Sequence, residues 1–327
     1  MTDSQIIGIA QQVGSRSLHW LHSFYANGLG GFQEDVTTDL ANPNEIYKPL
    51  GEVALATGLL LREGVAGADD TRTARQIIDL AWAELREGDL LYDRQLRYPL
   101  MTDPLEVYVH FARAGFRHRA LEEQLATLNR LHSVRAAEQL PSRRLASANA
   151  RRVIGLDQLE DWNELAAATW LGATPEPWII DWLTAYYVTH SVFHLTDWGA
   201  RPECLPPHIR DYLRDWLPAW LDVWQEVGHW DLVGELLIVA ACIGELEQGT
   251  TGWAALASAQ LPDGLLPKDA NTATEGDPAQ LLADHGHTAV VAVVAATTTL
   301  ARALGGTAGA SAGAPAVTLG APPESAR

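Results

Sequence analysis

Hydrophobic and polar positions along the chain recur with the period of an α-helix, and no segment shows the sustained alternation typical of strands. Near the amino end, for example, Ile6, Ile9, Val13, Leu18 and Leu21 form one apolar face. The same reading predicts about twelve helices, near residues 3–27, 44–62, 71–87, 104–113, 119–131, 142–154, 159–170, 177–198, 207–227, 229–246, 252–259 and 283–304. The pattern therefore predicts an all-α fold.

The predicted helices are of two kinds. Segments 47–62, 229–244 and 285–303 are apolar on almost every side, and each begins with polar residues. A helix that is apolar all round is a buried helix. Segment 205–224, in contrast, is amphipathic and charged on one face. Alternation of buried and half-exposed helices is expected of two concentric rings. We therefore expect an α/α toroid of about six helical hairpins in a single domain, residues 1–304.

Two other segments bear on this architecture. Residues 259–267 read Ala-Gln-Leu-Pro-Asp-Gly-Leu-Leu-Pro. They resemble the Gln-x-x-Asp-Gly turns that join helices in terpenoid-cyclase-like toroids, although Pro-Asp-Gly is also a general turn sequence. Residues 305–327 are rich in Gly, Ala and Pro and lack a large apolar period. Such a composition predicts a disordered tail.

Composition excludes several classes of partner and site. The chain has 41 acidic and 23 basic residues and a formal net charge of −18, which argues against nucleic-acid and anionic-membrane partners. The uncharged run 288–301 is shorter than the roughly 20 residues of a membrane span. We find no secretory signal and expect a cytoplasmic protein. The only cysteines, Cys204 and Cys242, exclude a disulfide framework and an all-cysteine metal site.

The strongest candidate chemistry lies in residues 186–199, Tyr-Tyr-Val-Thr-His-Ser-Val-Phe-His-Leu-Thr-Asp-Trp-Gly. His190, His194 and Asp197 share one helix face. Such a set suits a divalent metal, an acid/base pair with a carboxylate that fixes the tautomer, or merely structural hydrogen bonds. Asp197 also precedes Gly199, a predicted helix terminator, where a carboxylate opposes the helix dipole. We expect an arginine or a protonated histidine to compensate it.

Further polar residues stand at the starts of the apolar helices. Asp231 suits a helix amino end, whereas Glu235 is flanked by apolar residues and is predicted to point inward, where it must be paired or protonated. His287 opens the last helix, and Lys48 and Glu52 are spaced for an ion pair. Twelve tryptophans, with a stripe at Trp216, Trp220 and Trp224, indicate core packing or an aromatic-lined cavity.

Together these residues resemble an actinobacterial family of unknown function found near biosynthetic gene clusters. The shared elements are Lys-Pro-Leu-Gly-Glu at 48–52, Thr-His-x-x-Phe-x-x-Thr-Asp-x-Gly at 189–199, Trp-Asp-Leu-x-x-Glu at 230–235 and His-Thr at 287–288. The resemblance covers about residues 44–300 and implies no activity. His194 departs from the family's pattern, which makes a metal held by His190 and His194 less expected.

We therefore expect an enzyme of natural-product metabolism, a cyclase, isomerase or lyase, that performs acid/base chemistry on an apolar or peptidic substrate in an aromatic-lined cavity. His190, Glu235, His287 and Asp197 are the predicted catalytic residues, with His190, Glu235 and His287 facing one cavity and His190 moving the proton. The predicted substrate-binding residues are Tyr187, Trp230, Asp231, Lys48 and Glu52.

Other functions stay open at this stage. The chain could be a carbohydrate-active hydrolase or epimerase, or a non-catalytic binding protein for a biosynthetic intermediate. A lanthionine-cyclase-like metal enzyme is disfavoured, because Cys204 and Cys242 lack the expected neighbouring motifs. We expect no cofactor and no tightly bound metal, and the oligomeric state is not predicted.

Overall fold

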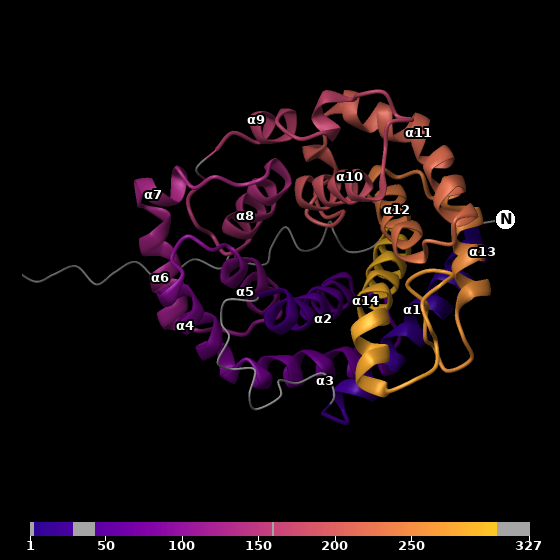
Figure 1. Ribbon diagram of the computed structural model, residues 1–327, viewed down its shortest axis with the longest axis horizontal. Coiled ribbons are helices and arrows are strands. Elements are labelled where there is room, and N and C mark those ends of the chain that lie inside the picture. Colours follow the sequence, from indigo (N-terminus) through magenta and orange to yellow (C-terminus); the bar gives the residue numbers. More distant parts are fainter. Residues whose placement is uncertain (1–2, 29–42, 159, 306–327) are drawn as a thin grey trace, which may run out of the picture.

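The structure, a computed structural model, describes residues 3–28, 43–158 and 160–305, and the regular secondary structure in these ranges is helical (Figure 1). This confirms the all-α prediction. Apart from residue 305, the predicted tail 305–327 lies outside the described residues. The α-helices are α1 Asp3–Tyr25, α2 Pro43–Glu63, α3 Ala68–Glu84, α4 Asp89–Arg97, α5 Asp103–Arg113, α6 Arg119–Asn129, α7 His132–Arg135, α8 Pro141–Val153, α9 Trp162–Ala167, α10 Trp182–Leu195, α11 Pro207–Glu226, α12 Trp230–Ile243, α13 Thr250–Ala259 and α14 Pro278–Ala303.

Six helices contact one another in a closed cycle. Helix α2 packs on α5, α5 on α8, α8 on α10, α10 on α12, α12 on α14, and α14 again on α2. Figure 1 shows these helices around the middle of the molecule, with the remaining helices outside them. Along the chain, each inner helix follows one or two outer helices. Three arginines near the carboxyl ends of α2, α5 and α8 meet Asp197 just after the carboxyl end of α10, so these inner helices run in the same direction. At the other end of the molecule, His287 of α14 contacts Glu52 of α2 and Asp231 of α12, so the amino ends of the inner helices gather there.

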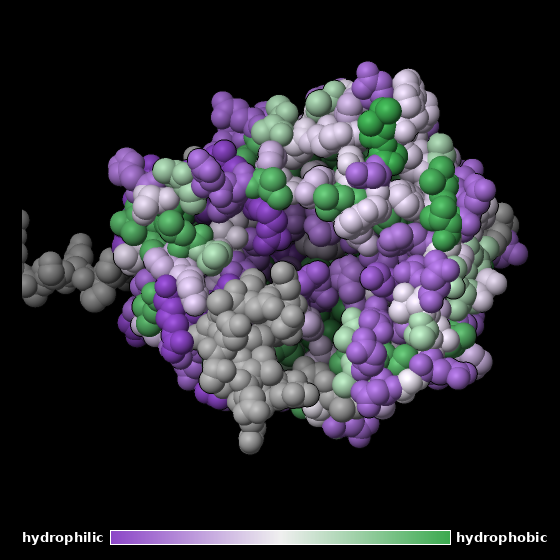
Figure 2. Space-filling model, in the orientation of Figure 1, coloured by the Kyte–Doolittle hydropathy of each residue, from purple (hydrophilic) through white to green (hydrophobic). Residues whose placement is uncertain are grey.

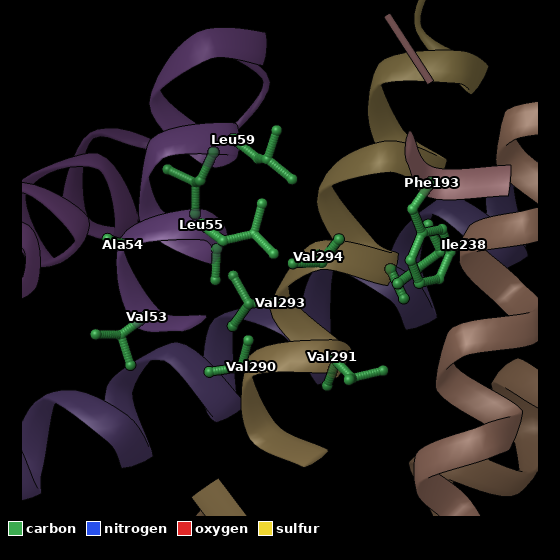
Figure 3. Packing of buried hydrophobic residues seen from close by; sticks show 14 of the residues in the cluster. Val53, Ala54, Leu55, Leu59, Phe193, Ile238, Val290, Val291, Val293 and Val294 are labelled. Atoms are coloured by element: carbon green, nitrogen blue, oxygen red, sulfur yellow. The ribbon is translucent and has the colours of Figure 1, made fainter. Parts of the chain in front are cut away.

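The inner helices predicted from their apolar sequences form much of the core. In α12 every residue from Asp231 to Ile243 is buried, and in α14 every residue from Thr288 to Leu300 is buried. Figure 3 shows the α14 valines lying between Leu55 and Leu59 of α2 on one side and Ile238 of α12 on the other. Burial of such side chains contributes about 1.5–3 kcal/mol each. Among the described helices, none combines the length and apolar character that crossing a bilayer would require.

The start of α10 corrects the sequence prediction of a helix over 177–198. The helix begins at Trp182, because the Asp181 side chain accepts a hydrogen bond from the backbone N–H of Thr184 at 2.7 Å and so caps the amino end. It ends at Leu195, after which Asp197 and Trp198 adopt left-handed φ values of 50° and 56°. His190 thus lies about two turns into the helix.

Other boundaries also differ from the prediction. Helix α14 starts five residues earlier than predicted, where Asp277 accepts hydrogen bonds from the N–H groups of Ala279 and Gln280. Helices α4 and α7 were not predicted. They are 9 and 4 residues long, and segments this short carry little periodic signal.

The loop between α13 and α14 is hydrogen-bonded to the first helix, α1. The Gln260 side-chain amide donates to the carbonyl oxygens of Val13 and Gly264 at 3.1 Å and to the Ser17 hydroxyl at 3.0 Å. Gly264 has a φ of +99°, and a Cβ atom there would lie 2.5 Å from the carbonyl oxygen of Arg16. The Gln-x-x-Asp-Gly sequence therefore fastens the α13–α14 connection onto α1.

Substituting Gly264→Ala is expected to lower the free energy of unfolding by about 2–3 kcal/mol. The alanine would have to hold a left-handed conformation, which costs about 1–2 kcal/mol, and would also collide with the Arg16 backbone. Urea denaturation followed by circular dichroism measures this loss. Gly8→Ala is the matched control, because Gly8 lies within α1 with open space around it, and alanine there should be neutral or stabilising by up to about 1 kcal/mol.

Candidate active site

Polar side chains from four inner helices meet near the amino ends of those helices. We call Glu52, His190, Asp231, Glu235 and His287 the polar cluster. Glu52 comes from α2, His190 from α10, Asp231 and Glu235 from α12, and His287 from α14. Carboxylates are favoured here, because the amino ends of helices carry partial positive charge. In the orientation of Figure 1 the amino end of α14 faces the viewer, and Figure 2 shows that face hollowed near its middle, with hydrophilic residues around the hollow.

His287 lies among the three carboxylates of the cluster. Its Nδ1 is 3.0 Å from Glu52 Oε1, and its Nε2 is 3.6 Å from Asp231 Oδ2 and 3.7 Å from Glu235 Oε1. On the other side of Glu235, His190 Nε2 is 3.4 Å from the same Oε1. The structure therefore brings His190, Glu235 and His287 together, as the sequence predicted, and adds two of the residues predicted to bind substrate, Glu52 and Asp231.

Hydroxyl groups of α10 hold the two α12 carboxylates. The Thr189 hydroxyl donates to Glu235 Oε2, and the Tyr186 hydroxyl donates to Asp231 Oδ2, each at 2.5 Å. Side chains of Asp231 and Glu235 are only 3% and 2% exposed, whereas those of His190 and His287 are 42% and 35% exposed. Fixed, buried carboxylates thus stand behind two accessible imidazoles.

The electrostatics of the cluster follow from this arrangement. Burial acts to raise the pKa of Glu235, but the nearby imidazoles of His190 and His287 outweigh it and lower the pKa to about 2. Burial acts to lower the pKa of His287, yet the charges of Glu52 and Asp231 and the hydrogen bonds to the carboxylates raise it well above its usual value. Glu235 is therefore ionised and His287 protonated at neutral pH when nothing is bound. Of the two states expected of a buried Glu235, paired or protonated, the structure therefore favours the paired one, because two imidazoles face it.

Lys48 borders the cluster from the solvent side. Its Nζ lies 3.5 Å from Glu52 Oε1, one helical turn away, and its side chain is 57% exposed. The predicted Lys48–Glu52 ion pair is therefore present. Because Glu52 also contacts His287, the ion pair places the positive charge of Lys48 beside the polar cluster.

Aromatic rings follow α10 at intervals of four residues. Trp182 contacts Tyr186, Tyr186 contacts His190, His190 contacts His194 and His194 contacts Trp198, with ring centroids 6.2–6.3 Å apart. This row places aromatic edges beside His190. Tyr186 was absent from the predicted site, although its spacing of four from His190 was the signal that could have found it.

The tryptophan stripe of α11 lies away from this row. Trp220 is buried, and its indole N–H donates to the carbonyl oxygen of Pro177 at 2.9 Å. Helix α11 belongs to the outer helices in Figure 1, so Trp220 packs between layers. Trp216 is exposed and contacts Trp178, and Trp224 contacts His229. Among the described contacts, the Tyr187 and Trp230 side chains make no hydrogen bond or ring contact with the polar cluster. Trp230 instead packs against the hydrophobic core.

Asp197 is separated from the other predicted catalytic residues. It lies seven residues after His190, about 10 Å further along the helix axis, and forms ion pairs with Arg62, Arg113 and Arg152. These arginines stand at the carboxyl ends of α2, α5 and α8. Burial acts to raise the pKa of Asp197, but the three arginines lower it far below its usual value. The expected arginine compensation of Asp197 is present, and it assigns Asp197 to structure at the opposite end of the inner helices.

Comparison with known proteins identifies a family for this chain but no activity. A family model described as "Domain of unknown function (DUF6895)" matches residues 14–297. The chain belongs to this family. The matched range includes Lys48, the whole polar cluster and Asp197. No curated protein and no solved structure matches the chain.

Proposed function

We propose that this member of the DUF6895 family is an enzyme that performs acid/base chemistry at the polar cluster. The observation that carries the proposal is the convergence of His190, Glu235 and His287, with Glu52 and Asp231, from four separate inner helices. Buried charged groups cost free energy unless they are paired, so a fold that needed only a core would gain from apolar residues here. Sites that gather such groups are typical of catalysis.

In this proposal His190 moves the proton. Its ring is accessible, and Glu235 lies 3.4 Å from Nε2. Since the Thr189 hydroxyl fixes Glu235, the carboxylate holds the imidazole in one orientation and stabilises its protonated form. Protonated His287 supplies positive charge beside the reacting group. The aromatic row along α10 supplies apolar surface for an apolar or peptidic substrate.

The proposal also includes an α/α toroid architecture and a role in natural-product metabolism. We interpret the closed cycle of inner helices and the six hairpins that supply it as an α/α toroid, in which the amino ends of the inner helices form the active-site end. The resemblance of residues 44–300 to an actinobacterial family near biosynthetic gene clusters supports a cyclase, isomerase or lyase of natural-product metabolism in the cytoplasm. The net charge of −18 supports a substrate that is neither nucleic acid nor anionic membrane.

The spacing of the carboxylates disfavours an inverting glycoside hydrolase built on Asp231 and Glu235. One oxygen of Asp231 lies within 4.8 Å of one oxygen of Glu235, whereas the carboxyl groups of inverting glycosidases are roughly 6.5–9.5 Å apart. The non-catalytic binding protein is distinguished from the proposed enzyme by the experiment that follows, and an epimerase would be recognised there by a carbohydrate as the compound that gains deuterium.

Proton transfer is tested by incubating the full chain with a metabolite extract of the source cells in D₂O and searching for new deuterium by mass spectrometry. We expect compounds that gain deuterium, lose mass or change retention with the wild-type protein. The His190→Ala variant should lose this activity by about 10²–10⁴-fold, with its thermal midpoint nearly unchanged, because the His190 side chain is 42% exposed.

His132→Ala is the matched control, since His132 is an exposed histidine of α7, and it should behave as wild type. A non-catalytic binding protein would enrich compounds from the extract without changing them. Retention of full activity in His190→Ala would overturn the assignment of the proton to this residue.

A further inference from the structure

We propose that Asp231, Glu235 and His287 bind one divalent transition-metal ion. This goes beyond the proposed acid/base function, because metal binding is measured without a substrate and holds or fails by itself. The sequence predicted no tightly bound metal anywhere in the protein, and the ligands considered for one were His190, His194 and Asp197. The structure separates Asp197 from that set and offers a different set of ligands.

The spacing of the three side chains suits ligands better than hydrogen bonds. His287 Nε2 is 3.6 Å from Asp231 Oδ2 and 3.7 Å from Glu235 Oε1, beyond the usual N–H···O range of about 2.7–3.2 Å. One ligand atom from each residue lies within 4.8 Å of the other two. Around a tetrahedral ion with bonds of about 2.0–2.2 Å, neighbouring ligand atoms are about 3.3–3.6 Å apart. Small movements of these side chains would enclose an ion.

A buried oxygen without a partner is the second observation. Asp231 is 2% exposed, and its Oδ1 makes no hydrogen bond within the described part of the chain. Buried carboxylate oxygens are nearly always paired, and an orphaned one indicates a missing proton, water or ion. Its position on a residue of the candidate ligand set favours an ion.

The surroundings of the ligands resemble the outer shell of a metal site. Glu52 Oε1 lies 3.0 Å from His287 Nδ1, although the two make no hydrogen bond in the present ring orientation. A small rotation of a neutral His287 ring would let Nδ1–H donate to Glu52 and leave the Nε2 lone pair for the ion. The Thr189 and Tyr186 hydroxyls hold the two ligand carboxylates. Carboxylates that orient ligand histidines, and hydrogen bonds to ligand carboxylates, are the usual supports of metal sites.

The charges also balance when an ion is bound. Glu52, Asp231 and Glu235 carry three negative charges, and Lys48, 3.5 Å from Glu52, carries one positive charge. A divalent ion with a neutral His287 brings the sum to zero. A divalent ion would therefore offset the charge of the buried carboxylates.

The donor atoms indicate which ions fit. One imidazole nitrogen with two carboxylates suits Zn²⁺, Mn²⁺ or Fe²⁺, whereas Mg²⁺ and Ca²⁺ prefer oxygen ligands throughout. Three protein ligands leave a position open for water or substrate, as in catalytic sites. His190, 3.4 Å from Glu235, lies next to this set and outside it.

Isothermal titration calorimetry of the untagged full chain, after treatment with EDTA, tests the site with ZnCl₂ and with MnCl₂, and elemental analysis gives the stoichiometry. We expect one ion per chain with at least one of these metals, at micromolar affinity or tighter. Glu235→Gln and His287→Gln should each abolish this binding. Glu52→Gln keeps all three ligands and should weaken binding about 10–100-fold.

The matched control is Glu106→Gln. Glu106 is a half-buried carboxylate on α5, another inner helix, paired with Arg143 at 2.7 Å, and its replacement should leave the affinity unchanged. Circular dichroism of each metal-free variant confirms folding. If one ligand variant does not fold, Glu52→Gln and the other ligand variant test whether the metal binds at this site.

Absence of saturable binding at 100-fold excess of either metal would overturn the proposal, as would unchanged affinity in Glu235→Gln and His287→Gln. Metal binding as expected with full activity in His190→Ala would leave the site standing and refute the role of His190 in proton transfer. If His190→Ala loses activity and the wild-type protein binds no metal, the role of His190 in proton transfer stands and the metal site is refuted.

Discussion

Replacing Asp197 with asparagine is expected to lower the free energy of unfolding by about 3 kcal/mol, near the lower end of the range for breaking a buried ion pair. Asp197 contacts Arg62, Arg113 and Arg152, and its side chain is 10% exposed. Asparagine keeps the shape and tolerates the left-handed φ of 50°, so the variant removes the charge and one acceptor oxygen without straining the backbone. Arg62 would keep its ion pair with Glu63, but Arg113 and Arg152 would be left close to each other without a carboxylate between them.

The contacts of Asp197 explain why this loss should be large. Arg62 also donates to the carbonyl oxygens of Asp197 and Trp198, both at 3.2 Å, and Asn149 donates to Asp197 Oδ1 at 3.1 Å. The carboxylate therefore joins the carboxyl ends of α2, α5 and α8 to the end of α10. Arginines at these ends are individually favourable, because they face the negative ends of the helix dipoles, but their mutual approach depends on Asp197.

Urea denaturation of Asp197→Asn beside Glu123→Gln measures the effect. Glu123 pairs with Arg119 at 2.7 Å, and both side chains are more than half exposed, so its replacement should change stability by less than about 0.5 kcal/mol. Adding Arg113→Gln to Asp197→Asn should restore part of the loss, because the most confined of the unpaired cations is removed. Equal stability of Asp197→Asn and wild type would show that the three arginines need no counter-ion.

The sequence predicted those features that depend on local period. Helix α12 was recognised as buried because its residues are apolar on all sides, and Glu235 was expected to point inward because apolar residues flank it. The proximity of Glu235 and His287 followed from the parallel direction of helices that each begin with polar residues. His190 was placed level with them on the assumption of a helix that begins near Pro177, whereas α10 begins at Trp182. Such arguments need only the helical period and the direction of the chain.

Other features depend on partners far apart in the sequence. Arg62, Arg113 and Arg152 occupy ordinary positions in the last turns of three helices, and no local signal joins them to Asp197. The contact between Glu52 and His287 likewise spans most of the chain. The α10 start was placed too early because Pro177 resembles a helix start, whereas the capping hydrogen bond of Asp181 decides the boundary.

The stability of the protein is expected to fall as the pH is lowered from about 6.5 towards 3, and His110 near the end of α5 accounts for much of this. Burial lowers the pKa of His110 to about 3, Arg113 adds to the effect, and Asp197 opposes it. An unfolded histidine has a pKa of about 6.5. Between these values the unfolded state binds a proton that the folded state does not, so the free energy of unfolding decreases as the pH falls.

Burial, with the charges of His190 and Arg143, also lowers the pKa of His194 well below its usual value. His194 therefore contributes in the same direction, whereas Asp197 loses its stabilising charge only below about pH 4. Above pH 7 all three groups have the same protonation in the folded and unfolded states. Stability should then be independent of these groups.

The variant His110→Gln isolates the contribution of one imidazole. A full shift from 6.5 to 3 would correspond to about 1.4 kcal/mol per pH unit, and the partial exposure of His110 reduces this. We expect wild type to lose about 2–3 kcal/mol more than His110→Gln between pH 7 and pH 4, measured by urea denaturation at each pH. His132→Gln, which alters an exposed histidine, should follow the wild-type profile. Parallel profiles for His110→Gln and wild type would mean that His110 takes up a proton in the folded protein as readily as in the unfolded chain.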